Sequence, residues 1–506
     1  MAIGCRYVNW AVRINGSLCF LNCDLLEGLV LSTGDLDPND WNSFRAEAHK
    51  MLDKSIDKME NVSTGRVWSP VPNEIRNKFE ENLPLKGSSA NNIIGEILPY
   101  GVGNTHPRFF GWVHGAGTPS GVIADIASAS MNVNAGGRDH IAPVVEKQVL
   151  SWCLEIMGMP KSGSGLIVSG TSVATIIAMK VARDQKIKGS RKKGISQTQL
   201  VGYTSEQSHS CIKQAFDILG LGTEALRVVK CNKNFEIDLE SLKKLITQDK
   251  LNGLIPFCVV GTAGAVNMGA IDDLEGIASI AKSEDLWFHV DGAFGAAALL
   301  GKLAYERLSG ISFADSLAFD FHKWFQVNYE AGCVLFKDEA SHRASFSDRA
   351  EYLRGSERGL AGGDFWAVDY GPELSRGFKS LKVWAHLKEH GVEALGNSID
   401  RNIKLAKYLE KRIHNEDCLT SMAPTPLNIN CFRFIPNLNL AIEKLDKVNE
   451  EIVILLQERG IAVPSTTRIN NQIAIRVNIT NHRTQESDLD ILVDAILEIG
   501  DELTKK

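Results

Sequence analysis

Cysteine is scarce in this chain, and no apolar run is long enough to suggest a membrane span. Only 10 of 506 residues are cysteine, far below the density of a secreted disulfide scaffold, so reduced thiols and a cytoplasmic location are expected. Cys19 and Cys23 have the spacing of a metal-binding pair, but no second pair follows nearby, so no metal site is expected. The apolar stretch at residues 18–31 is short and interrupted by polar residues, which disfavours a membrane span or a signal peptide.

The chain also lacks an excess of basic residues. Lys and Arg total 55 against 61 Asp and Glu, so the net charge of −6 gives no global positive field for nucleic acid. The basic run at residues 186–193 contains Gly189 and Ser190 and is interpreted as a solvated loop. With 44% hydrophobic and 23% charged residues, the composition predicts an ordinary globular chain with a large core.

Short apolar runs alternate with helical patterns between residues 106 and 385. This alternation favours an α/β fold with a mainly parallel sheet that helices cover on both faces. The C-terminal third, in contrast, predicts a small α+β domain. The expected strands are 166–169, 254–260, 287–290, 316–319, 427–434 and 472–477. The expected helices are 173–185, 205–219, 274–282, 448–459 and 487–503.

Four parts are expected along the chain. Residues 1–33 form an extension of unknown role. Residues 34–105 form an N-terminal arm of helices and turns, because apolar residues from Trp41 to Ile56 recur at helical spacing and prolines follow. Residues 106–385 form the large domain, and residues 386–506 form the small C-terminal domain.

Two motifs stand where expected strands end. Ser169-Gly170-Thr171-Ser172 joins a strand to a helix, where backbone N–H groups and hydroxyls can bind an anion; an ordinary helix N-cap is the alternative. Asp291 follows the strand at 287–290, at the sheet edge where α/β proteins bind ligands. A structural carboxylate capping the next turn is the alternative there.

Two further motifs carry a lysine and a histidine. Lys323, in Asp320-Phe321-His322-Lys323-Trp324, has apolar and aromatic neighbours that disfavour charge on an amine, as covalent amine chemistry requires. A surface lysine whose stem covers apolar area is the alternative. His209 stands at the expected start of a helix, and taken alone it would be interpreted as structural.

Together these motifs resemble a known family. SGTS, SEQSHS, FHVDGAF and DFHKW, in this order, are similar to the group II pyridoxal-phosphate-dependent amino-acid decarboxylases, which are fold type I enzymes. The similarity runs from about Leu36 to the C-terminus and includes HPRFF at 106–110, Tyr352-Leu353 and residues 375–382. It implies a fold type I, transferase-like architecture, a homodimer with shared active sites, and decarboxylation through a Lys323 aldimine and a quinonoid intermediate.

The resemblance also implies roles for individual residues. Lys323 would carry pyridoxal phosphate covalently, Asp291 would keep the ring nitrogen protonated so that the ring is an electron sink, and His209 would stack on the ring. Tyr352 would protonate the carbon after CO2 leaves, which favours an amine product over an aldehyde. The other cofactor contacts implied are Thr171, Ser172, Thr262, Ala293 and His322. The substrate contacts implied are His106, Phe109, Trp112 and Arg476.

Some positions depart from the family pattern. Asp320 stands where the family often has Asn, and because its charge would repel phosphate it is given no role. Gly111-Trp112-Val113 replaces the Asn-Gln-Leu of acidic-substrate members, which favours an aromatic L-amino acid. Arg108 and Arg476 keep glutamate, aspartate and cysteine sulfinate open as substrates. Aldehyde synthesis and carbon–carbon lysis also stay open, whereas the intact motifs disfavour a non-catalytic descendant.

Overall fold

The computed structural model describes residues 12–14, 17–19, 36–85, 91–195, 199–348, 355–436 and 440–505. Cys23, Tyr352 and most of the expected extension at 1–33 therefore lie outside the described residues. The chain divides into two compact units, residues 1–54 and residues 55–506. In the first unit, strand β1 (Val12–Ile14) pairs antiparallel with β2 (Ser17–Cys19).

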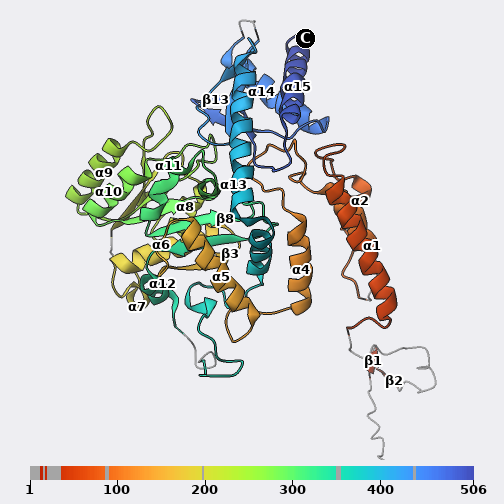
Figure 1. Ribbon diagram of the computed structural model, residues 1–506, viewed down its shortest axis with the longest axis vertical. Helices are drawn as coiled ribbons and strands as arrows, with labels where there is room; N and C mark the ends of the chain where they lie inside the picture. Colours follow the sequence, from red (N-terminus) through yellow and green to blue (C-terminus); the bar gives the residue numbers. More distant parts are fainter. Residues whose placement is uncertain are drawn as a thin grey trace, which may run out of the picture. The chain divides into compact units, whose positions relative to one another are not determined.

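A sheet of seven strands forms the centre of the large domain (Figure 1). Strand β9 is antiparallel to both of its neighbours, β3 and β8, whereas β8, β7, β6, β4 and β5 pair in parallel. The strands in sheet order are β3 (Ser164–Val168), β9 (Gly332–Phe336), β8 (Ser316–Asp320), β7 (Trp287–Asp291), β6 (Ile255–Thr262), β4 (Leu200–Ser205) and β5 (Leu226–Val229).

Helices cover both faces of this sheet because its strands are apolar on both sides. Leu166 and Val168 pack in a core with residues of α6 and α8, whereas Ile167 between them packs in a second core with residues of α5 and α10. The helices before α13 are α1 (Trp41–Glu60), α2 (Asn73–Asn77), α3 (Asn91–Ile97), α4 (Pro119–Met131), α5 (Ile141–Ile156), α6 (Thr171–Lys186), α7 (Ser190–Lys193), α8 (Ser210–Ile218), α9 (Leu239–Leu251), α10 (Leu274–Glu284), α11 (Tyr305–Leu308) and α12 (Glu339–Phe346).

The C-terminal part is a four-stranded antiparallel sheet with two helices packed in one core. Helix α13 (Lys379–His414) leads into it from the large domain and bends at Gly391, where φ is +69° (Figure 1). The remaining elements, with the strands in sheet order, are β10 (Leu419–Ser421), β11 (Ile429–Phe434), β13 (Gln472–Asn478), β12 (Ser465–Ile469), α14 (Ile442–Glu458) and α15 (Glu486–Thr504).

The expected fold class is confirmed, and two local expectations are wrong. The helix expected at 205–219 begins only at Ser210, because β4 continues to Ser205 and a turn follows it. The basic run at 186–193 is not a simple loop, since Lys186 ends α6 and Ser190–Lys193 forms α7. None of the helices in the described ranges combines the length and apolar character that crossing a bilayer requires.

Candidate functional site

A cavity of about 510 Å³ lies where β3, β6, β7 and β8 end, at the carboxyl edge of the parallel strands. This is the edge at which open α/β sheets bind ligands. The start of α8 contributes His209 and Cys211 to the lining, and the segment before α4 contributes Trp112 and Val113. The residues predicted from the sequence that line this cavity are Trp112, Thr171, Ser172, His209, Thr262, Asp291, Ala293, His322 and Lys323.

Asp291 ends β7, with Thr262 of β6 and Ala318 of β8 beside it in register. Its side chain is only 3% exposed, and one carboxylate oxygen accepts a hydrogen bond from the Ala293 N–H at 3.1 Å. Burial raises the pKa of Asp291, and the positive charge of nearby Lys323 opposes that shift. A carboxylate in this position is stabilised by a cationic ring N–H brought into the cavity.

Lys323 follows β8 and approaches the buried carboxylate of Asp320. Its Nζ lies 2.7 Å from Asp320 Oδ2, and the other oxygen of Asp320 accepts a hydrogen bond from Thr171 N at 2.7 Å. Thr171 begins α6, so Asp320 places a negative charge at the N-terminus of that helix. Asp320, which has no role by family resemblance, therefore connects Lys323 to the candidate anion site at the N-terminus of α6.

Backbone hydrogen bonds hold the rings of both cavity histidines. His209 is the N-cap of α8, and its Nδ1 accepts from Cys211 N at 3.2 Å. His322 Nδ1 accepts from Ala331 N at 3.1 Å, and burial lowers the pKa of His322. Each ring is therefore fixed with its other edge available to a ligand.

Two buried hydroxyls of the cavity have no hydrogen-bond partner among the residues that the structure describes. These are Oγ1 of Thr171 and Oγ1 of Thr262. Buried polar groups are nearly always paired, so the two orphan hydroxyls indicate that a polar ligand belongs here. Pyridoxal phosphate fits these groups: an anionic phosphate suits the N-terminus of α6, a protonated ring nitrogen suits Asp291, and an aldehyde suits the amine of Lys323.

Only Trp112 of the four predicted substrate contacts lines the cavity. Phe109 packs in a small core with Val67 and Val463, and the Nδ1 of buried His106 accepts the N–H of Arg108. The direct substrate roles of Phe109 and His106 stay predictions.

Arg476 is buried on β13, outside the lining of the cavity. Its Nη1 donates to Trp112 O at 2.8 Å, and its Nε donates to Val266 O at 2.8 Å. These bonds fix two segments whose side chains do line the cavity. The structure thus gives Arg476 a positioning contact, and a contact with the substrate stays a prediction.

Sequence reasoning did not find Tyr329, which lines the cavity seven residues before the end of β9. Its ring stacks on that of His322, with centroids 4.4 Å apart, and its hydroxyl lies 3.0 Å from His114 Nδ1. No local pattern marks Tyr329, because its partner His114 is 215 residues away in the sequence.

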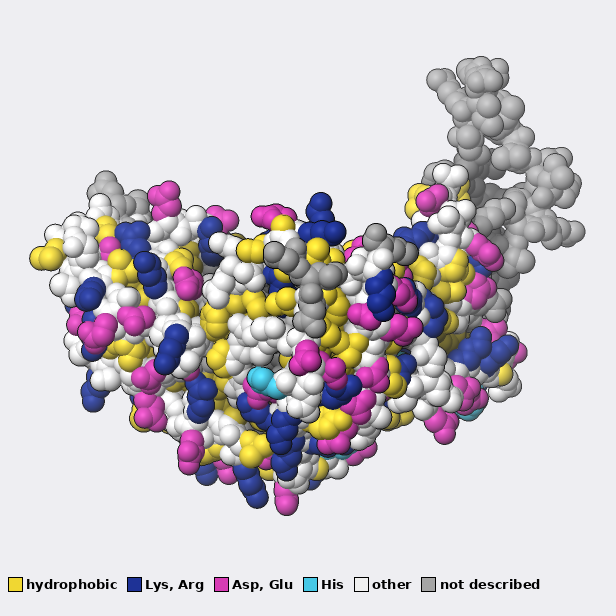
Figure 2. All heavy atoms as spheres, turned by 90° about the horizontal axis from the view of Figure 1, so that it is seen from above, with side chains coloured by type: hydrophobic (Ala, Val, Ile, Leu, Met, Phe, Trp, Pro, Cys, Tyr) yellow, Lys and Arg dark blue, Asp and Glu magenta, His cyan; other side chains and the backbone are white. Residues whose placement is uncertain are grey.

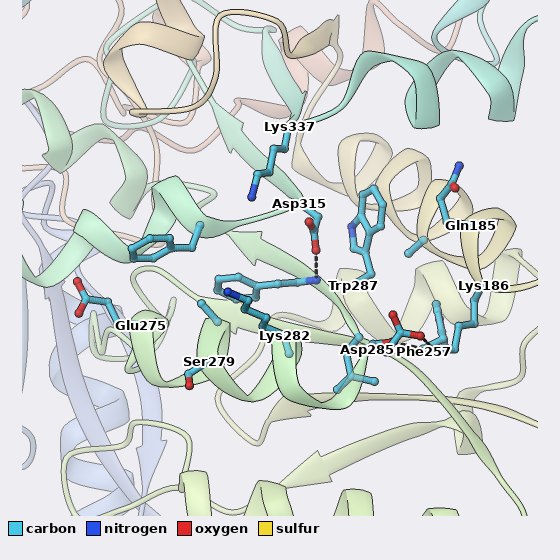
Figure 3. A pocket seen from close by; sticks show the side chains of 16 residues that line it. Gln185, Lys186, Phe257, Glu275, Ser279, Lys282, Asp285, Trp287, Asp315 and Lys337 are labelled. Carbon is cyan, nitrogen blue, oxygen red and sulfur yellow. Dashed lines mark hydrogen bonds and ion pairs between the residues drawn. The ribbon is translucent and has the colours of Figure 1, made fainter.

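A larger cavity of about 870 Å³ lies at the opposite edge of the sheet, where β6, β7 and β8 begin (Figure 3). Lys186, Lys282, Asp315 and Lys337 are among its lining residues, and Asp315 accepts a hydrogen bond from Phe288 N at 2.8 Å. None of the residues predicted for catalysis or cofactor binding lines it. The smaller cavity at the carboxyl edge is therefore the candidate active site.

Fold and site together define an α/β enzyme built to hold pyridoxal phosphate, and comparison with known proteins agrees. The model of the pyridoxal-dependent decarboxylase conserved domain matches residues 72–435. An aromatic-L-amino-acid decarboxylase of Bacillus atrophaeus is 31% identical over 469 residues, which are 91% of this chain and 96% of the relative. A phenylacetaldehyde synthase of Arabidopsis thaliana is 28% identical over 474 residues, with 89% and 94% covered.

The chain belongs to the pyridoxal-dependent decarboxylase family. Its fold is also that of the Oryza sativa TDC crystal structure with PLP and tryptamine, with a TM-score of 0.85 at 22% identity and coverage of 93% of this chain and 100% of the other. The predicted family, enzyme class and cofactor are confirmed: this is a pyridoxal-phosphate-dependent amino-acid decarboxylase.

Proposed function

We propose that the chain converts an aromatic L-amino acid to the corresponding amine and CO2, with pyridoxal phosphate bound covalently to Lys323. The observation that carries this proposal is the shared cavity of Lys323, buried Asp291 and the two unpaired threonine hydroxyls. The amine of Lys323 matches the aldehyde of the cofactor, the carboxylate of Asp291 matches its ring nitrogen, and the unpaired hydroxyl of Thr171 at the N-terminus of α6 matches its phosphate.

Each residue has a role that follows from its position. Pyridoxal phosphate supplies an electron sink for the pair that the departing carboxylate leaves behind. Asp291 holds a proton at the ring nitrogen, because its burial makes a paired cation favourable. Thr171, Ser172 and His322 bind the phosphate, and His209 covers the ring and limits access of water. Tyr352 acts as the acid that protonates the product carbon.

The walls of the cavity support an aromatic substrate. Trp112 and Tyr329 contribute ring surface to the lining. Among the lining residues that the structure describes, those able to carry positive charge are His209, His322 and Lys323, which the cofactor engages. The second carboxylate of an acidic substrate would need a further cation, and Arg476 lies outside the lining of the cavity, with its Nε and Nη1 donating to backbone carbonyls.

The test is release of amine and CO2 from cofactor-loaded protein offered L-Trp, L-Tyr, L-Phe, L-dihydroxyphenylalanine, L-His, L-Glu, L-Asp and cysteine sulfinate. Equimolar amine and CO2 from aromatic substrates is the expected result. Turnover confined to the acidic ones would contradict the substrate proposal. Lys323→Ala should abolish both turnover and borohydride-trapped cofactor, whereas Lys337→Ala, in the larger cavity, should retain both.

Aldehyde synthesis is the second candidate, because a phenylacetaldehyde synthase is among the relatives. The family resemblance makes Tyr352 the residue that distinguishes the two reactions, because a phenol at this position favours the amine. We expect amine from the native chain, whereas Tyr352→Phe should give aldehyde, ammonia and hydrogen peroxide, with dissolved O2 as the oxidant. If the native chain released mainly aldehyde, the chain would be an aldehyde synthase and the proposed amine-forming reaction would be wrong.

We also propose a homodimer and a cytoplasmic location. Helices α4 and α5 expose apolar side chains that a second copy would cover, and the cysteines among the described side chains are free thiols. Helix α4 begins beside the active site, since Thr118 N donates to the side chain of Asn328, next to Tyr329. A dimer through α4 would therefore bring the partner close to the cavity.

A further inference from the structure

Tyr329, which lines the cavity, forms a hydrogen-bonded pair with His114. The phenol oxygen lies 3.0 Å from His114 Nδ1, and the two ring centroids are 5.7 Å apart. The ring of Trp112 lies 6.0 Å from that of His114, at 74° to it. Tyr329 and Trp112 both line the cavity, so this wall presents ring surface with one phenolic oxygen.

The protonation of the pair sets the direction of its hydrogen bond. Burial raises the pKa of Tyr329 to about 12, so the phenol keeps its proton. Burial, together with the charges of His322 and Lys323, lowers the pKa of His114, so that ring is neutral and its Nδ1 can accept. Tyr329 then donates to His114, and the phenolic oxygen keeps its lone pairs for another donor.

The position of this oxygen is fixed on two sides. The Tyr329 ring stacks on His322 at 28°, and His322 precedes the cofactor lysine in the chain. The backbone carbonyl of Tyr329 accepts a hydrogen bond from Lys382 Nζ at 3.0 Å. Tyr329 is nevertheless 47% exposed, so its phenol is not enclosed by protein.

We propose that Tyr329, oriented by His114, determines substrate specificity by accepting a hydrogen bond from an N–H or O–H on the substrate ring. The inference rests on the proposed aromatic function and narrows it to indole and phenol amino acids in preference to phenylalanine. A substrate ring bound over this wall covers the phenol and keeps water from it. The site then discriminates against an analogue without a ring donor, because the covered phenolic oxygen is left unpaired.

The test compares kcat/KM for L-Trp, L-Tyr and L-Phe in the native holoenzyme and in Tyr329→Phe. For the better of L-Trp and L-Tyr, kcat/KM should fall about 10- to 100-fold, whereas the value for L-Phe should change less than about threefold. Tyr305→Phe, at an exposed tyrosine on α11, is the matched control and should leave all three values unchanged. An equal change for the three substrates, or none, would overturn the inference.

The absorbance of the bound cofactor shows whether Tyr329→Phe still binds it. If it does not, a second variant, His114→Leu, tests the inference. In His114→Leu the Tyr329 phenol loses its acceptor and therefore its fixed orientation. The ratio of kcat/KM for the better of L-Trp and L-Tyr to kcat/KM for L-Phe should then fall at least about threefold. Unchanged discrimination would overturn the role of the pair. If both variants release amine but keep the native ratios of kcat/KM between substrates, only this inference is refuted. If the native protein turns over no aromatic substrate, the proposed function is refuted as well.

Discussion

Asp320 contacts both Lys323 and the N-terminus of α6 in the active site. Its carboxylate is 3% exposed, accepts the Thr171 N–H and lies 2.7 Å from Lys323 Nζ. The N-terminus of a helix stabilises an anion, and here a protein carboxylate already occupies that position. The cofactor phosphate must therefore bind beside a like charge, and Lys323 must leave an ion pair before it can react.

Asp320→Asn should tighten the binding of pyridoxal phosphate by about tenfold, which corresponds to about 1.4 kcal/mol. The amide oxygen can still accept from Thr171 N, while the like charge and the ion pair with Lys323 are removed. Titration of apoprotein with pyridoxal phosphate, followed by absorbance, measures the dissociation constant. Asp315→Asn, at a half-buried carboxylate of the opposite sheet edge (Figure 3), is the control and should not change the dissociation constant.

Weaker binding in Asp320→Asn would contradict this account. It would indicate that the carboxylate assists the cofactor through His322, whose Nε2 lies 3.6 Å from Asp320 Oδ2 and whose pKa Asp320 raises against the larger, opposite effect of burial. The control separates either outcome from a general effect of replacing a hydrogen-bonded aspartate at an edge of the sheet.

At the scale of helices and strands, local pattern predicted the elements that carry the motifs. The apolar runs at 287–290 and 316–319 correspond to β7 and β8, because each is short, buried and bounded by polar residues. Strand β4 was not predicted, since Gly202 and Thr204 interrupt its apolar run. The expected domain boundary at 385/386 falls inside α13, where one helix continues across it and bends at Gly391.

The active site could be predicted only as far as contacts are local or carried by motifs. Asp291, Thr171 and Lys323 lie at the ends of elements in recognisable order, and the structure brings them to one cavity. Tyr329 depends on His114, and Arg476 on the backbone of Trp112, through contacts between distant segments. Such contacts follow from tertiary packing, which periodicity and spacing do not report.

One buried ion pair joins α5, β3 and the segment before α13. Arg376 makes two hydrogen bonds to Glu146, at 3.0 and 2.7 Å, and Glu146 also accepts from Ile167 N. Arg376→Met should lower the free energy of unfolding by about 3–5 kcal/mol, because it leaves a buried carboxylate without its cation. Urea denaturation followed by circular dichroism measures the loss.

The control for this prediction is an ion pair at the surface. Arg412→Met removes partly exposed contacts with Glu416 and Asp494 and should cost about 1 kcal/mol or less. If Arg376→Met and Arg412→Met lowered the free energy of unfolding equally, burial of the Arg376–Glu146 pair would not determine its contribution to stability.

The surface of the whole molecule combines mixed charge with localised apolar exposure. On the face shown in Figure 2, basic and acidic side chains are interspersed without a field of one sign, as the net charge of −6 implies. Such a face gives no electrostatic basis for binding nucleic acid. Helices α4 and α5 differ, because they expose Ile123, Ile126, Met131, Ile141 and Val144, each at least 43% accessible.

A second copy of the chain is the expected cover for these residues, since large exposed apolar patches mark interfaces. Ile123 and Ile126 lie three residues apart on α4 and therefore on one side of the helix. Ile123→Glu combined with Ile126→Glu should shift the mass in light scattering from about twice 55.5 kDa towards 55.5 kDa. Leu251→Glu, at an exposed leucine at the end of α9, should leave the dimer intact.

The same variants test whether the active sites depend on the dimer. Helix α4 begins at the segment that holds Asn328, so separating the copies should loosen the wall that carries Tyr329. We therefore expect the α4 variant to lose activity and cofactor affinity in proportion to the monomer fraction. A monomer with full activity would show that each copy has a complete site. A native protein that is monomeric at micromolar concentration would remove the proposed interface altogether.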